Sequence, residues 1–111
     1  MAVFGASVPS RTPEEIFHDF TNGTLAIIDV REPREIQAAK IDGSIYIRMN
    51  EIPHNLEKIP RDTDVGILCR SGNRSAAVTR FLRENGFSNV FNIAGGINRW
   101  SVTLDNSLKP I

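Results

Sequence analysis

The sequence predicts an α/β fold in which a parallel β-sheet is covered by helices on both faces. Short apolar runs typical of buried strands alternate along the chain with segments that carry helical spacing or helix-start signals. The chain has 111 residues, of which 41% are hydrophobic, so it suffices for one domain with its own core. No repeat, low-complexity tract or linker divides it. We therefore expect a single domain over residues 1–111, with its core at about 12–101.

A strong helix-start signal opens the first half of the chain. Thr12 is a capping residue, Pro13 stands at the first helical position, and Glu15 follows three residues after the cap. The helical spacing ends at Asn22, which is followed by glycine. The next segment, residues 25–30 (LAIIDV), is a short apolar run that predicts a buried strand.

The middle of the chain predicts a second strand between two helical segments. Residues 32–39 contain a proline near their start and can open a short helix. A turn at Gly43 leads into residues 44–47, whose apolar side chains indicate a strand. Asn50 is a candidate cap for a further helical stretch, which stops at Pro60.

The second half of the chain repeats the alternation of strand and helix. The helix expected over residues 75–85 is the clearest, because its apolar side chains share one face and Gly86 ends it. The tail over residues 103–111 has little pattern, and we expect it to be flexible. The remaining expected elements are strands at residues 65–69 and 90–93 and a short helix at residues 97–100.

Charge and hydropathy exclude several classes of protein. The 13 basic residues balance the 13 acidic ones, so no overall field favours nucleic acid or an anionic membrane. The apolar runs are far shorter than a membrane span, which needs about 20 residues. The first residues lack the basic start and apolar stretch of a signal peptide. We therefore expect a cytoplasmic protein without nucleic-acid or membrane partners.

One cysteine limits the available chemistry. Cys69 cannot form an intramolecular disulfide, and together with His18 and His54 it has no ligand-like spacing. We expect no metal and no cofactor. The 13 basic residues comprise ten Arg and three Lys, and the arginine fork suits oxyanions and carboxylates.

The position of Cys69 indicates an activated thiol. It falls at the carboxyl end of a predicted parallel strand, where such sheets form their binding sites, and the loop after it enters the clearest helix. From Val65 to Arg83 the sequence has four arginines and no acidic residue. Local positive potential stabilises a thiolate over a thiol. The alternative is that Cys69 is a small buried hydrophobic residue, which is the common role of a lone cysteine after an apolar strand.

The loop over residues 69–75 (CRSGNRS) resembles the active-site loop of single-domain rhodaneses, the thiosulfate sulfurtransferases. Three further segments match the family in order: residues 29–35 (DVREPRE), residues 41–47 (I-x-G-S-x-x-I) and residues 95–100 (G-G-I-x-x-W). The resemblance covers about residues 12–101. It implies a five-stranded parallel sheet flanked by helices, with the cysteine at the base of a cradle of backbone amides.

The resemblance also implies a reaction. Cys69 is expected to take a sulfane sulfur from thiosulfate or a persulfide donor as a persulfide. An acceptor such as cyanide, a thiol or a protein then removes that sulfur. The residues expected to bind the anionic donor and the persulfide are Arg70, Ser71, Gly72, Asn73, Arg74 and Ser75.

A charge pair between Asp29 and Arg31 is a candidate support for this loop, because strand ends converge at one edge of a parallel sheet. The alternative is a buried structural pair without a direct part in catalysis.

The sequence departs from the family pattern at two positions outside the loop. Ala39 and Lys40 replace a usual Gly-His, and Arg48 replaces a usual proline. These residues bear on loop shape or on a partner surface more than on sulfur chemistry.

Two other functions stay open from the sequence. One is a non-catalytic rhodanese module that regulates or docks partners, although such modules commonly lack the cysteine. The other is a cysteine phosphatase or arsenate reductase. The active-site loops of these enzymes have the pattern Cys-x5-Arg, with arginine at the sixth position after cysteine. Here that position is Ser75, and Arg74 comes one residue early. The shorter loop favours a sulfur atom over a tetrahedral phosphate.

Overall fold

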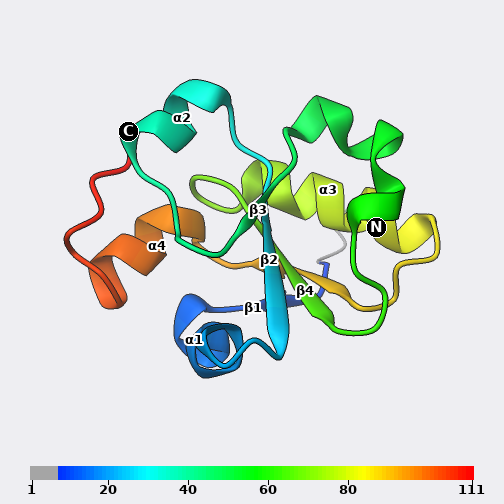
Figure 1. Ribbon diagram of the computed structural model, residues 1–111, viewed down its shortest axis with the longest axis horizontal. Helices are drawn as coiled ribbons and strands as arrows, with labels where there is room; N and C mark the ends of the chain where they lie inside the picture. The colour runs from blue at the N-terminus through cyan, green and yellow to red at the C-terminus, as the bar shows by residue number, and fades with distance from the viewer. Residues whose placement is uncertain (1–7) are drawn as a thin grey trace, which may run out of the picture.

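The computed structural model describes residues 8–111 and contains a five-stranded sheet in the order β1-β5-β4-β2-β3 (Figure 1). All four strand pairs are parallel, so the predicted α/β fold is confirmed. The amino-terminal segment examined for a signal peptide, residues 1–7, lies outside the described residues. The strands are β1 (Ser10–Arg11), β2 (Leu25–Asp29), β3 (Ile45–Tyr46), β4 (Asp64–Leu68) and β5 (Val90–Ile93).

Helices cover both faces of the sheet. One apolar cluster packs α1 and α4 against the sheet through residues such as Ile16, Ile27 and Trp100. The other packs α3 and the 3₁₀ segments against the opposite face through residues such as Ile28 and Val78. Figure 1 shows α1 and α4 together on one side and α3 on the other. The helices are α1 (Pro13–Thr21), α2 (Pro33–Ala38), α3 (Asn73–Glu84) and α4 (Gly96–Thr103), and the 3₁₀ segments are η1 (Met49–His54) and η2 (Leu56–Lys58).

The predicted start of α1 is confirmed in atomic detail. The backbone N–H of Glu15 donates to the Thr12 hydroxyl over 3.2 Å, and the Glu15 carboxylate accepts from the Thr12 N–H at 2.8 Å. Pro13 occupies the first helical position, where its missing N–H removes a donor that would lack a partner in the helix.

The boundaries differ from the prediction in the second half of the chain. The helix expected from residue 75 begins at Asn73, because Gly72 takes a left-handed conformation (φ +112°) and caps it without a side chain. The last helix is longer than expected and runs from Gly96 to Thr103. The usual sequence signal for a helix start is a capping side chain, and a glycine cap has none, so the sequence did not predict the start of α3 at this position.

The helical stretch expected after Asn50 is two short 3₁₀ segments. The first begins at Met49 rather than after Asn50, and it contains Pro53. Proline lacks an N–H and disfavours a regular α-helix at its position, which explains the tighter and interrupted geometry. Ile52 and Ile59 nonetheless point into the core, as the apolar spacing predicted.

Strand β1 is the one strand of the sheet that no hydrophobic pattern in the sequence predicted. It contains two residues and pairs with β5 at the edge of the sheet. The Asn92 N–H donates to the Pro9 carbonyl, and the Ala94 N–H donates to the Arg11 carbonyl. A segment this short carries no alternation of apolar and polar residues, so only the resemblance implied a fifth strand.

The tail returns along the surface after α4. Thr103 is the last residue of that helix, and Leu104 and Leu108 pack against the cluster around Trp100. The flexibility expected for the tail stays a prediction. Among residues 8–111, no helix has both the length and the apolar character that crossing a membrane requires.

Candidate active site

Cys69 follows the last residue of β4 directly and begins the loop that enters α3. Because all strands are parallel, their carboxyl ends meet at one edge of the sheet, and the loop lies at that edge between α2, α3 and α4 (Figure 1). Only 1% of the Cys69 surface is exposed. The cysteine is therefore buried at the base of the loop.

The sulfur atom has hydrogen-bond partners on the loop and at the start of α3. The backbone N–H of Gly72 donates to Sγ over 3.1 Å, and the hydroxyl of Ser75 lies 3.2 Å from it. Burial raises the pKa of the Cys69 thiol, but hydrogen bonds from the Ser75 side chain and from the backbone of Ser75, Gly72 and Ser71 outweigh it. The net pKa lies below the ordinary value of 9.0. The site thus favours a thiolate mainly through hydrogen-bond donors.

The start of α4 holds the other side of the same loop. The N–H of Ile97 donates to the Cys69 carbonyl over 2.9 Å, and the N–H of Asn98 donates to the Arg70 carbonyl over 3.0 Å. Gly96 makes this approach possible, because a Cβ there would overlap both carbonyl oxygens. The glycine pair before α4 therefore does more than turn the chain. It orients the two peptide groups that follow Cys69.

Asp29 and Arg31 form the predicted pair, and it is buried. Arg31 donates through Nε and Nη2 to the Asp29 carboxylate, with a closest distance of 2.8 Å, and both side chains are at most 1% exposed. Arg31 also donates to the carbonyl of Glu35, within α2, and to the carbonyl of Ala39, directly after the helix. The pair therefore ties the end of β2 to α2.

Arg74 is held in a second ion pair. Its two terminal nitrogens donate to the two oxygens of the Glu35 carboxylate at 2.8 and 2.9 Å. The hydrogen bonds with Arg74 hold the pKa of the Glu35 carboxyl at about 2, against an ordinary 4.5. This arrangement joins the first turn of α3 to α2. It also neutralises the positive charge that the sequence places beside Cys69.

The remaining loop residues face the outside. Arg70, Ser71 and Asn73 are exposed, and Asn73 is the first residue of α3 rather than part of the loop. Arg70 also lines a hollow of about 200 Å³. It is lined by Glu32, Arg34, Glu35, Arg70, Arg74 and Ile111. Figure 1 shows the end of the chain, to which Ile111 belongs, beside α2.

Reasoning from the sequence missed two residues of the site. Asn92 on β5 is 7% exposed and accepts a hydrogen bond from the Ser75 hydroxyl, and Glu35 binds Arg74. A buried amide within the otherwise apolar strand Val90–Ile93 is the signal that could have found Asn92. Glu35 ends the segment of residues 29–35 that matches the family, and this motif is the signal that could have found it.

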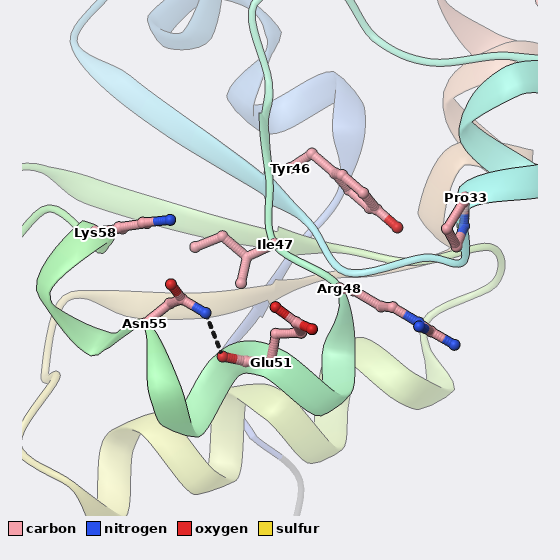
Figure 2. Close-up of a pocket in the computed structure, with 7 residues that line it drawn as sticks. All are labelled: Pro33, Tyr46, Ile47, Arg48, Glu51, Asn55 and Lys58. Carbon is pink, nitrogen blue, oxygen red and sulfur yellow. Dashed lines mark hydrogen bonds between the residues drawn. The ribbon is translucent and has the colours of Figure 1, made fainter.

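The two departures from the family pattern lie at other hollows. Arg48 lines one of about 270 Å³ beside β3 and η1, together with residues such as Tyr46 and Lys58 (Figure 2). Its guanidinium pairs with Glu32 at 2.6 Å. Lys40 lines another of about 500 Å³, near α1 and α4. Cys69 lines neither hollow.

The backbone N–H groups that contact Cys69 have no free electron pair to offer a metal ion. Within the described range, residues 8–111, no group of three or more His, Cys, Asp or Glu side chains could hold a metal ion.

Comparison with known proteins identifies relatives that share most of this chain. The protein named "Sulfurtransferase" of Allochromatium vinosum is 39% identical over 77 residues, which cover 69% of this chain and 72% of the relative. "Thiosulfate sulfurtransferase GlpE" of Tolumonas auensis is 29% identical over 77 residues and covers 69% and 73% of the two chains. Relatives bearing these names support sulfur transfer in general as the activity.

A solved structure agrees with the fold. Reduced CoADR-RHD of Bacillus anthracis superposes with a TM-score of 0.81 at 36% identity. The match covers 89% of this chain and 17% of that longer one. The Rhodanese-like domain family matches residues 12–103, close to the span inferred from the four motifs. The chain therefore belongs to the rhodanese-like domain family.

Proposed function

We propose that this protein transfers a sulfane sulfur through a persulfide on Cys69. The observation that carries the proposal is the environment of the sulfur atom. It is buried, it receives the Gly72 N–H, it lies beside the Ser75 hydroxyl, and the pKa of the thiol is lowered. A thiolate held in this way is a nucleophile at neutral pH without a neighbouring general base.

The first half of the reaction loads the cysteine. The Cys69 thiolate attacks the outer sulfur of thiosulfate, and a new S–S bond forms to Sγ. The S–S bond of thiosulfate breaks, and its electron pair leaves with sulfite. The outer sulfur of the persulfide then carries the negative charge. The backbone of Ser71, which is exposed, and of Gly72, which is half-buried, supplies N–H donors beside Sγ for this charge.

The second half of the reaction discharges the cysteine. A nucleophilic acceptor attacks the outer sulfur, and the electron pair of the Cys69–sulfur bond returns to Sγ. With cyanide the product is thiocyanate. With a thiol, from a small molecule or a protein, the product is a new persulfide. Because no proton has to move at Sγ in either step, the site needs no acid or base besides the acceptor's own.

Arg70 is the cation best placed to attract the donor. Its side chain is exposed at the hollow beside the loop, and Arg34 lines the same hollow from α2. Arg74 contributes less, since Glu35 already binds its guanidinium through two hydrogen bonds. We therefore assign the attraction of thiosulfate, or of another anionic sulfane donor, first to Arg70 and Arg34.

The test is the intact mass of the protein after incubation with thiosulfate, followed by cyanide and a thiocyanate assay. The expected result is a gain of one sulfur atom that cyanide removes and that the Cys69→Ser variant does not show. A serine hydroxyl stays protonated in the same surroundings, so the variant should fold but take no sulfur. A folded wild-type protein with a free thiol and no adduct from thiosulfate or an organic persulfide would instead favour a docking module.

A further inference from the structure

Asn92 is the polar residue nearest to the site that the proposed reaction leaves unexplained. It lies on β5, opposite Ile67 of β4 and Ser10 of β1. Its neighbours on the strand, Phe91 and Ile93, are apolar and buried. A buried amide lowers the stability of the folded state unless its hydrogen bonds are satisfied, so we expect the Asn92 side chain to have a hydrogen-bond partner.

The partner of Asn92 is the hydroxyl that touches the nucleophile. Ser75 Oγ donates to Asn92 Oδ1, and the same Oγ lies 3.2 Å from Cys69 Sγ. Ser75 is fully buried, and the Thr79 hydroxyl fixes its backbone by donating to the Ser75 carbonyl. Asn92 Nδ2 faces Ser10 Oγ at 3.4 Å. A continuous polar chain therefore runs from the sulfur to the edge of the sheet.

The number of hydrogens available limits which hydrogen bonds the Ser75 hydroxyl can donate at one time. A serine hydroxyl has one hydrogen to donate. When Cys69 is a thiol, its own S–H donates to Ser75 Oγ, and the hydroxyl hydrogen goes to Asn92. When Cys69 is a thiolate, the best use of the hydroxyl hydrogen is a charge-assisted bond to Sγ. The hydroxyl cannot donate to Asn92 and to Sγ at once.

We propose that Asn92 is a positioning residue that competes with Cys69 for the Ser75 hydroxyl hydrogen and takes it whenever Sγ carries no negative charge. The amide oxygen thus stabilises the thiol relative to the thiolate. For the persulfide this inference rests on the proposed function. There Sγ is bonded to two atoms, the charge lies on the outer sulfur, and the hydrogen returns to Asn92. The hydroxyl therefore turns once in loading and once in discharge.

Among the described residues, no charged side chain is a hydrogen-bond partner of Sγ that could take the place of the Ser75 hydroxyl. Arg70 is on the loop itself and exposed, and Arg74 on α3 is bound to Glu35 on α2. At the end of β2, Asp29 and Arg31 bind each other, and β5 carries no charged side chain between Val90 and Ile93. On α4 the charged side chain is Arg99, which pairs with Glu14 of α1.

The test is the pKa of Cys69 in an Asn92→Val variant. Valine suits a buried strand and removes the competing oxygen. Cys69 is the single cysteine, so the pH dependence of its alkylation by iodoacetamide reports its pKa directly. We expect the pKa to fall by about half a unit to one unit, the effect of one hydrogen bond. At a pH below that pKa, alkylation should be about threefold to tenfold faster.

A double variant separates positioning from a general structural effect. In a Ser75→Ala background there is no hydroxyl to compete for, so adding Asn92→Val should leave the pKa of Cys69 unchanged. Asn89→Val is the matched control. The Asn89 amide binds the Pro60 and Thr63 carbonyls, contacts that do not involve the Ser75–Asn92 chain. It should change stability without changing the pKa of Cys69.

Three outcomes would overturn the proposal. They are an unchanged or raised pKa in folded Asn92→Val, the same result in Asn92→Ala, and a shift that persists without the Ser75 hydroxyl. If both variants unfold, the wild-type protein still gives an answer. The NMR signal of the Asn92 side-chain amide should titrate together with Cys69, and a signal that does not move contradicts the proposal. None of these measurements needs sulfur transfer, so they fail or succeed independently of the proposed function.

Discussion

The two flanks of the Cys69 loop are built from different interactions. The flank toward β5 uses uncharged groups, and we call Gly72, Ser75 and Asn92 the neutral side. The flank toward α2 uses ion pairs, and we call Asp29–Arg31 and Glu35–Arg74 the charged side. Only the neutral side contacts the sulfur atom. The comparison indicates that the neutral side sets the reactivity of Cys69, while the charged side holds α2 and α3 in place.

The largest effect is expected on the charged side. Arg31→Met leaves the Asp29 carboxylate buried without its partner and removes the hydrogen bonds to the Glu35 and Ala39 carbonyls of α2 and its C-cap. We expect the free energy of unfolding, measured by urea denaturation, to fall by about 3–5 kcal/mol. The exposed pair of Arg48 and Glu32 is the control, and Arg48→Met should cost less than about 1 kcal/mol.

A double variant sharpens this prediction. Asp29→Leu combined with Arg31→Met removes both buried charges and should recover part of the lost stability. If Arg31→Met alone is as stable as the wild type, the charged side does not hold the fold, and the comparison of the two sides breaks down.

The second effect concerns reactivity on the neutral side. Ser75→Ala removes a hydrogen-bond donor to the thiolate, so the pKa of Cys69 should rise by about one to two units. The pH dependence of alkylation measures this change. Thr79→Val is the control, since the Thr79 hydroxyl is equally buried and binds the Ser75 carbonyl without reaching the sulfur. An equal pKa shift in Thr79→Val would assign the effect to packing instead of the hydroxyl.

The sequence predicted the framework of the site better than its contacts. The apolar runs located β2, β4 and β5, and the end of one of them placed Cys69 at the carboxyl edge of the sheet. The segment from Val65 to Arg83 contains no acidic residue, but acidic residues from elsewhere in the sequence lie close to it in the folded protein. In space Glu35, 39 residues before Arg74, binds that arginine. Asn92 likewise reaches Ser75 from 17 residues away. Such partners depend on how strands and helices pack, which local patterns do not encode.

The third effect is a difference between Arg70 and Arg74 in their influence on KM for thiosulfate, although both lie close to Cys69 in the sequence. Arg70→Glu reverses an exposed charge at the hollow beside the loop, and we expect KM for thiosulfate to rise about fivefold to tenfold with little change in kcat. Arg74→Met should change KM less, because Glu35 already neutralises that side chain, and should lower stability more.

Lys40→Glu supplies the control for charge alone, since Lys40 is exposed at a different hollow. A rise in KM of the same size in Lys40→Glu would mean that the overall charge of the protein, and not the position of Arg70, attracts the donor. The difference between Arg70→Glu and Lys40→Glu should shrink at high ionic strength.

The smallest effect is a pH dependence on the charged side. The Arg74 guanidinium holds the pKa of the Glu35 carboxyl at about 2, below its ordinary 4.5. A lowered carboxyl pKa stabilises the folded state above the unfolded value and loses that contribution as the pH falls toward the folded value. Glu35→Gln should therefore cost about 1 kcal/mol at neutral pH, since Arg74 is partly exposed and solvent screens the pair.

The difference in stability between wild type and Glu35→Gln should shrink below pH 4.5 and disappear near pH 2. Urea denaturation at a series of pH values measures it. Glu14 titrates in the same range beside Arg99 on the far helices, but it is present in both proteins and cancels from the difference. The pKa of Cys69 should move much less in Glu35→Gln than in Ser75→Ala, because Arg74 acts on the sulfur only through space and neither Arg74 nor Glu35 is among its hydrogen-bond partners. A shift as large as that of Ser75→Ala would mean that the charged side tunes the nucleophile as strongly as the neutral side, and the division between the two sides would no longer hold.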